Sequence, residues 1–355
     1  MNNFFGGVGV ILTLELRQRV RGTAWYVLLG IFVVLVLAVT ILSSIALNGF
    51  GMMSAGEAGG GIYSAIIYFV LLLGTLVAPA LSGNAINGDR EAGTLATTQV
   101  TLVTTGQIVV GKFLAAWITA LAFLAAAVPF ILYASLVGGL SVITVVVSIA
   151  VLAAELGVVA AIGVGLSGIL SRPLFSIVAT YLLVATLSVG TLIAFGLGGL
   201  AVQSTSTSTS TYSTTYTDDG IPIDCTETDT YTTQVPRFDY FWGILVANPY
   251  VVLADSVPTT YDAQGNATDL FGNLKQAVRS AQIPPELNDV YNDCEAAAAG
   301  YPSDYPTARE TIESTVPGWF VGLAIQIVLA AAALLGALSR TRTPAGTLPK
   351  GSRIA

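Results

Sequence analysis

The sequence predicts an all-α polytopic membrane protein, with six transmembrane helices, an amphipathic helix before them and a small extracytoplasmic domain between helices five and six. Of the 355 residues, 54% are hydrophobic and only 10% are charged, and the mean hydropathy is +0.76. A soluble domain carries about 25% charged residues. The charge is also unevenly divided, because residues 201–316 carry a net −12 and the remainder carries +5. This division indicates two environments for one chain.

Six apolar runs are long enough to cross a bilayer, whose hydrocarbon core of about 30 Å takes about 20 helical residues. The third run is long and contains Pro129, so we expect a tilt or a kink there. The fifth begins at Pro173, which suits the first turn of a helix. The predicted spans are residues 24–47, 62–81, 108–137, 141–170, 173–200 and 318–338.

Basic residues near the span ends determine the predicted orientation. With six spans, all ten Lys and Arg residues outside 201–316 fall on one side, which the positive-inside rule assigns to the cytoplasm. We therefore expect a multi-pass protein of the cell membrane with both termini in the cytoplasm. Its predicted parts are 1–200 with the amphipathic helix and five spans, the extracytoplasmic domain 201–317, and the sixth span with its tail, 318–355.

Two segments beside the predicted spans allow more than one interpretation. Apolar and charged residues are interleaved from Ile11 to Arg21, which indicates a helix on the inner membrane surface or only a basic flank of the first span. Residues 238–254 are apolar apart from Asp239, but the run is short and contains Asn248-Pro249. We interpret it as a re-entrant or interfacial segment, with a buried helix of the outer domain as the alternative.

The predicted outer domain begins with a Ser/Thr tract and holds both cysteines. Residues 204–217 are of low complexity, which predicts a flexible or extended linker. Cys225 and Cys294 are expected to form a disulfide, because a pair of cysteines outside the cell is usually oxidised. In the chain-entropy model a closed loop of this length contributes roughly 4 kcal/mol. Two free buried thiols are the alternative.

No residue is predicted to be catalytic or to bind a metal. Histidine is absent, which excludes imidazole bases, and two cysteines cannot build a Cys-type zinc site. Residues 106–113 are similar to a phosphate-binding loop, but Phe113 stands where Ser or Thr is needed, and a predicted span begins there. We therefore expect no nucleotide hydrolysis by this chain, and we interpret Lys112 as a lysine that extends to the membrane interface.

The connector between spans two and three concentrates charge, and it carries the sharpest motif of the sequence. It reads Asp89-Arg90-Glu91, then Gly93-Thr94-Leu95, and Gly111-Lys112 opens the next span. A basic amphipathic N-terminus, six spans and a large outer segment with Ala247-Asn248-Pro249-Tyr250 accompany it. In this combination the membrane part resembles the permease subunit of a type-2 ATP-binding-cassette (ABC) exporter.

The resemblance implies a role for the connector and a set of partners. Residues 89–99 would form a cytoplasmic coupling helix on a separate ABC ATPase subunit, which would bind ATP and magnesium, while this chain would bind no cofactor. A second permease copy or a paralogue and membrane lipids would be further partners, and nucleic acid would not. The implied activity is export or extraction of an apolar or amphipathic substrate. An ordinary solvated connector is the alternative for the residues assigned to coupling, which are Asp89, Arg90, Glu91, Gly93, Thr94 and Leu95.

Glu155 lies near the middle of the fourth predicted span. An ionisable side chain at that depth costs at least about 2.5 kcal/mol on insertion scales, so we expect it to face protein or water. It is then either protonated or hydrogen-bonded to Ser, Thr or Tyr of a neighbouring helix, in a structural or a transport role. Two other functions stay open at this point. One is a proton-coupled secondary transporter that uses Glu155, and the other is a membrane-anchored receptor or envelope protein that acts through its extracytoplasmic domain.

Overall fold

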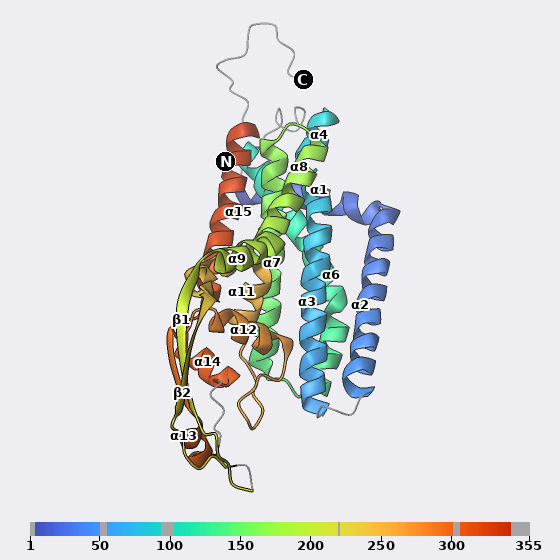
Figure 1. Cartoon of the computed structure of the whole chain (residues 1–355). Helices are drawn as coiled ribbons and strands as arrows, with labels where there is room; N and C mark the ends of the chain where they lie inside the picture. The colour runs from blue at the N-terminus through green and yellow to red at the C-terminus, as the bar shows by residue number, and fades with distance from the viewer. Residues whose placement is uncertain (1–3, 50–54, 94–102, 219–220, 301–305, 342–355) are drawn as a thin grey trace.

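The computed structural model describes residues 4–49, 55–93, 103–218, 221–300 and 306–341. Within these ranges, six helical segments are long and apolar enough to cross a membrane, which confirms the predicted all-α membrane fold. They form a bundle, and α1 (Phe4–Arg21) lies across one end of it (Figure 1). The spanning elements are α2 (Thr23–Gly49), α3 (Ala55–Ser82), α6 (Thr105–Val137), α7 (Val142–Ile169), α8 with α9 (Pro173–Ala185 and Thr191–Ala201) and α15 (Trp319–Thr341).

Helix α7 is the most deeply buried of the six spans and packs against α3, α6 and α15. Its glycines permit this packing. A Cβ atom added at Gly165 or Gly168 would collide with Ala333 or Ala337 of α15. Small residues of this kind let membrane helices approach closely, because lipid offers no hydrophobic driving force for their association. The α7–α15 pair is therefore closely packed, and α3, α6 and α8 contact it through α7.

The main apolar core lies between α2, α3, α6 and α7, and it continues into the segment after the fifth span. Val252 and Leu253 of α11 (Pro249–Ser256) and Phe271 of α12 (Leu270–Ser280) are fully buried members of this core. Residues 238–254 form the 3-10 turn Phe238–Tyr240, α10 (Trp242–Leu245) and α11. Because α11 is buried against α7, α12 and α15, the structure favours the alternative of a buried outer helix over the re-entrant or interfacial segment.

A buried carboxylate joins these outer helices to the sixth span. Asp255 of α11 accepts hydrogen bonds through Oδ2 from the backbone amides of Gly318, at 2.7 Å, and Trp319, at 3.0 Å, where α15 begins. Its Oδ1 lies 2.7 Å from Nε of Arg279, which also donates to the carbonyl of Thr315 next to α14 (Ala308–Ser314). The first amides of a helix lack partners within the helix, and a carboxylate there satisfies them and interacts well with the helix dipole.

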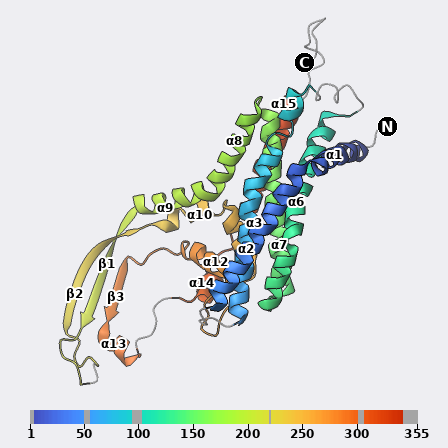
Figure 2. The same cartoon turned by 90° about the vertical axis from the view of Figure 1, so that its right-hand side faces the viewer.

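The fifth span is bent. Helix α8 ends at Ala185, one π-helical turn covers Thr186–Gly190, and α9 continues in a different direction (Figure 2). A π turn disturbs the regular pattern of helical hydrogen bonds. Asn248 stabilises it, because its Nδ2 donates to the carbonyl of Ser188 at 2.6 Å and to Oγ1 of Thr191 at 2.9 Å. Its Oδ1 accepts from the backbone amide of Tyr250, so the same side chain also begins α11.

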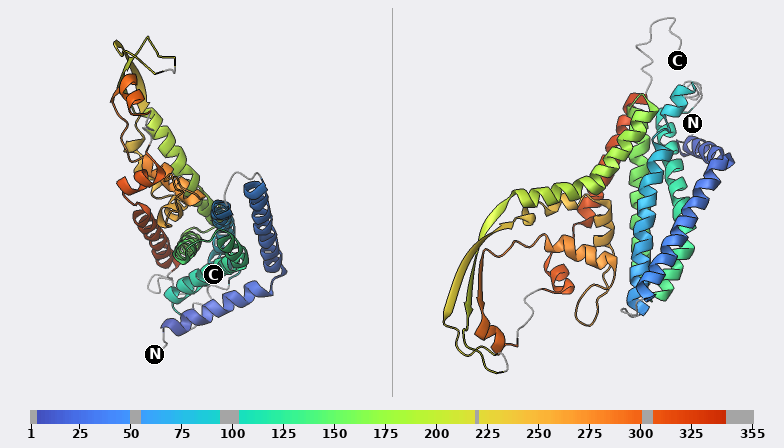
Figure 3. Two further views of the ribbon diagram at one scale, coloured as in Figure 1. Left: turned by 90° about the horizontal axis from the view of Figure 1, so that it is seen from below. Right: turned by 45° about the vertical axis from the view of Figure 1, so that its right-hand side comes forward.

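Residues 203–236 and 288–298 are here called the arm, and its described residues, which are all but 219 and 220, extend away from the bundle (Figure 2 and Figure 3). The arm holds a three-stranded sheet in the order β2-β1-β3. Strand β1 (Gln203–Tyr212) pairs antiparallel with β2 (Glu227–Pro236) and parallel with β3 (Asn288–Asn292). At its base, Arg237 binds Asp239 and Oγ of Ser204.

The expectation of a linker at 204–217 is wrong, because most of this tract is the central strand of the arm. Its period of two residues places every Thr of β1 on one face and every Ser on the other, and β-branched Thr favours a strand. The expected disulfide between Cys225 and Cys294 is present, with 6.0 Å between the Cα atoms. It joins the β1–β2 connection to α13 (Asp293–Ala298).

Candidate functional site

The candidate site is α4 (Asn87–Glu91), a short helix that follows α3 at the same end of the bundle as α1 (Figure 1). Its start is held by hydroxyl groups of two spans. Oγ of Ser167 in α7 accepts from the backbone amides of Ile86, at 2.9 Å, and Asn87, at 3.1 Å. The buried Asn87 side chain donates to Oγ of Ser176 in α8 at 3.2 Å. These contacts fix α4 to α7 and α8 by directional bonds.

Arg90 extends the attachment to the end of α7. Its guanidinium donates to the carbonyls of Gly168 at 3.3 Å and Leu170 at 3.2 Å, and to Oδ1 of Asn87 at 2.9 Å. The last carbonyls of a helix have no partner within the helix and form its negative end, so a cation is favourable there. Arg90 therefore stabilises the C-terminal end of α7, and its guanidinium group points toward this chain's own helices.

Lys112 of α6 joins α4 to α1. Its side chain is only 3% exposed, and its Nζ lies 2.7 Å from Oδ2 of Asp89 and also forms an ion pair with Glu15 of α1. A buried ammonium loses several kcal/mol of hydration, which close carboxylates offset. The interpretation of Lys112 as a lysine that extends to the interface is wrong, because α1 covers it and two carboxylates from neighbouring elements surround it.

Helix α1 packs directly on the first turns of α6. The side-chain amide of Gln107 donates to the carbonyl of Phe4 at 3.2 Å, and a Cβ at Gly111 would collide with Ile11. Arg19 donates to the carbonyl of Leu81 at the end of α3, 3.1 Å away. Burial lowers the pKa of Arg19, and the neighbouring Glu15 opposes this shift. Helix α1 thus belongs to the same layer of polar contacts as α4.

The predicted coupling residues divide into two groups. The side chain of Asp89 contacts Lys112, and the side chain of Arg90 contacts the end of α7. Both residues therefore make contacts within this chain. Glu91 is exposed, and so is Gly93, which has φ of +70° and open space where a Cβ would lie. Thr94 and Leu95, with the rest of the predicted helix 89–99, lie outside the described residues. Among the described residues of the motif, Glu91 and Gly93 form the outward surface.

Glu155 is 1% exposed and lies in the interface between α7 and α15. Its carboxyl group is next to the side-chain amide of Gln326, a partner other than the Ser, Thr or Tyr of one of the two expected alternatives. Nε2 of Gln326 donates to the carbonyl of Ala247 at 3.0 Å, which ties α15 to the outer segment. Oε1 of Glu155 and Oε1 of Gln326 both lack a hydrogen-bond partner among the described residues.

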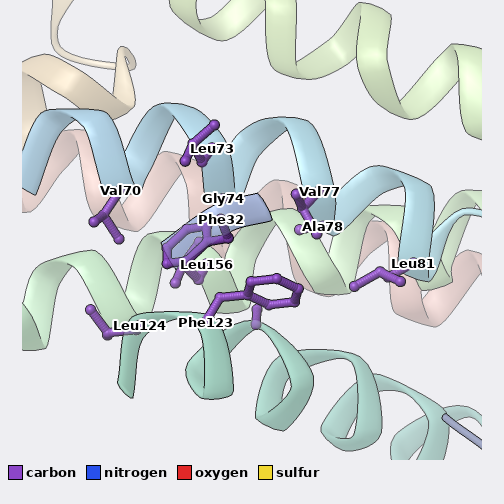
Figure 4. A pocket seen from close by; sticks show the side chains of 11 residues that line it. Phe32, Val70, Leu73, Gly74, Val77, Ala78, Leu81, Phe123, Leu124 and Leu156 are labelled. Carbon is purple, nitrogen blue, oxygen red and sulfur yellow. The ribbon is translucent and has the colours of Figure 1, made fainter. Parts of the chain in front are cut away.

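An apolar cavity lies between α2, α3, α6 and α7 (Figure 4). Its volume is only about 10 Å³, about the size of one water molecule, and no polar side chain lines it, so it offers no partner to water or to a polar ligand. Within the described ranges, no three acidic or cysteine residues come close enough to hold a metal ion. The lining residues are Phe32, Val70, Leu73, Gly74, Val77, Ala78, Leu81, Ala120, Phe123, Leu124 and Leu156.

We predict that Lys112→Met destabilises the chain by about 3 kcal/mol, because Glu15 and Asp89 are left without their shared cation. Unfolding by sodium dodecyl sulfate in mixed micelles measures the loss. Arg17→Met, at an exposed position of α1, is the matched control and should have little effect. Neutralising both carboxylates together with Lys112 should restore most of the stability. Wild-type behaviour of Lys112→Met would contradict a role for the ion pairs.

We predict that Glu155→Gln keeps or raises stability, because an amide nitrogen at this position can donate to the unpartnered Oε1 of Gln326. Glu155→Leu should cost about 1 kcal/mol, since the Gln326 side chain loses the buried polar group beside it. The same unfolding assay compares the two variants. Equal stability of the Leu and Gln variants would show that the contact between α7 and α15 does not depend on this polar pair.

Comparison with known proteins agrees with this architecture. No curated protein matches the chain significantly. The model of the family described as ABC-2 family transporter protein matches residues 10–235, which include most of α1, all of α4 and the first five spans. Since this match spans more than half of the sequence, the chain belongs to the ABC-2 transporter family of membrane proteins.

Proposed function

We propose that this chain is the permease subunit of an ATP-driven transporter and that the energy of hydrolysis enters it at α4. One observation carries the proposal. Helix α4 is hydrogen-bonded or ion-paired to α6, α7 and α8, while Glu91 and Gly93 at its end stay exposed. An element with one side fixed to several spans and the other side exposed is suited to receive a partner and to move those spans.

The contacts of α4 define which spans would move. Arg90 holds the end of α7, and Asn87 holds α8 through Ser176. Interfaces of this kind shift between discrete arrangements and resist gradual deformation. A displacement of α4 would therefore carry α7 and α8 together, and α8 leads to the bend at the π turn. The contact between Asn248 and Ser188 would pass this motion on to the outer helices.

The remaining parts of the proposal concern partners, substrate and orientation. ATP and magnesium would bind a separate ATPase subunit, and two permease copies or two paralogues would form the transporter. The substrate would be apolar or amphipathic and would be exported or extracted from the membrane. The end with α1 and α4 would face the cytoplasm, since the described Lys and Arg residues outside 201–316 lie at that end, and the acidic arm would lie on the outer side. For Glu155 we propose a structural role between α7 and α15.

We predict that Glu91→Ala and Gly93→Trp weaken ATPase binding at least about tenfold, or uncouple hydrolysis from transport, while the permease itself stays stable. Loss of one partner of a desolvated charge pair typically costs about 2–5 kcal/mol, and Trp at Gly93 adds bulk and a strained backbone. Purified complexes are compared for ATPase content, basal hydrolysis and stimulation by substrate.

Two controls separate coupling from folding. Asp89→Ala should lower the stability of the permease alone, since it removes a partner of Lys112. Glu295→Ala changes an exposed acid on the arm and should alter neither property. If Glu91→Ala and Gly93→Trp keep full ATPase content and unchanged coupling, α4 is only a connector.

We predict that Cys225 and Cys294 react with a membrane-impermeant thiol reagent in intact cells only after reduction. The disulfide blocks both thiols beforehand, and an external arm makes them accessible afterwards. Disrupted cells serve as the control for total reactivity. Labelling without reductant would refute the bond, and labelling only in disrupted cells after reduction would refute the proposed orientation.

A further inference from the structure

The two faces of the arm sheet differ in chemistry. One face, here called the serine face, has Ser208 and Ser210 on the central strand, flanked by Tyr231 and Asp229 on β2 and by Asp289 and Tyr291 on β3. The opposite face, here called the threonine face, has Thr207, Thr209 and Thr211 beside Thr228, Thr230 and Thr232. Acidic and aromatic side chains of the paired strands therefore gather on the serine face.

The register of the strands gives the serine face a regular shape. Ser208 lies between Tyr231 and Asp289, and Ser210 lies between Asp229 and Tyr291. Cross-strand neighbours have Cβ atoms about 4.5–5.5 Å apart, so each small serine has a larger side chain on either side. Two lines of larger side chains, here called walls, therefore stand about 9–10 Å apart on β2 and β3, and the line of serines between them is here called the trough. Each wall presents one tyrosine and one carboxylate, in opposite order.

Charge and spacing identify the kind of ligand that fits this trough. The arm contains eight Asp and Glu residues and no Lys or Arg. Asp229 and Asp289 are exposed, and Tyr231 is 55% exposed. Carboxylates and the faces of tyrosine rings both attract ammonium and guanidinium groups. Successive rows lie two residues apart, about 6.8 Å, which is also the distance between alternate side chains of an extended peptide.

The threonine face differs from the serine face in chemistry and can be compared with it directly. Its hydroxyl groups pair across the strands, with Oγ1 atoms 3.4 Å apart in Thr209 and Thr230 and 3.5 Å apart in Thr211 and Thr228. Its rows between β1 and β2 carry no charge. A cationic partner therefore finds carboxylates in the rows of the serine face and none in the rows of the threonine face.

We propose that the serine face of the arm binds an extended peptide segment with Lys or Arg at alternate positions. Each cationic side chain of the segment then meets one row, with a carboxylate on one wall and a tyrosine on the other. The small serines let the peptide lie close to the sheet. This site is separate from α4, so the proposal does not depend on coupling to an ATPase.

The test uses the purified full-length protein and a fluorescent peptide of about ten residues in which Lys and Ser alternate, with anisotropy as the readout. Asp229→Asn combined with Asp289→Asn should weaken binding at least tenfold, and Tyr231→Ser combined with Tyr291→Ser should weaken it severalfold. Thr209→Ser combined with Thr230→Ser is the matched control on the threonine face and should bind as the wild type does. Raising the salt from about 0.05 M to about 1 M should weaken binding, because exposed ion pairs are screened.

Three results would overturn the proposal. These are wild-type affinity in the Asp229→Asn and Asp289→Asn variant, equal binding of a peptide in which Glu replaces Lys, and complete competition by spermine at an equal charge concentration. The last result would show a surface for polycations in general. Retention of the Cys225–Cys294 disulfide, checked by mass after alkylation, confirms that each variant keeps the arm folded.

Discussion

A buried ammonium group loses much of its hydration and needs carboxylates within ion-pair distance to replace it. Lys112 meets this constraint with Glu15 of α1 and Asp89 of α4. Neither element has much apolar burial of its own, since α1 buries only Val8 and Ile11 and α4 buries only Asn87. Lys112 is therefore a charge that α1 and α4 share, and it acts together with the hydrogen bonds of α4 to α7 and α8 and with the packing of α1 on α6.

Polar side chains also bind the backbone where helices end or change direction elsewhere in the bundle. Arg90 binds the last carbonyls of α7, Asp255 binds the first amides of α15, and Asn248 binds a carbonyl of the π turn. These backbone groups have no regular helical partner, so each side chain supplies a hydrogen bond that lipid cannot supply. Because such bonds are directional, they connect spans more firmly than apolar contact alone. The proposed coupling from α4 to the outer helices relies on this property.

The sequence predicted those features that depend on local composition. Six apolar runs, the amphipathic start and the pairing of Cys225 with Cys294 are readable without tertiary information. The partners of Lys112 were not, because Glu15 and Asp89 are distant from it in sequence. The strand Gln203–Tyr212 is not readable from the sequence for a related reason, since its polar composition is that of a linker and only its partners β2 and β3 make it a strand. The sequence does not indicate that Gln326 is the neighbour of Glu155, because the position of a residue within its own helix does not show which residue of another helix it contacts.

The arm and the bundle are stabilised by different means, and this difference bears on what the arm does. The bundle buries a continuous apolar core, whereas the paired strands of the arm consist mainly of Ser, Thr and acidic residues. A small sheet without an apolar core gains little from burial, and here the β ladder, the disulfide and the Arg237 contacts hold it in place. Since side-chain packing is not what stabilises the arm, its surface residues can serve recognition without a cost in folding.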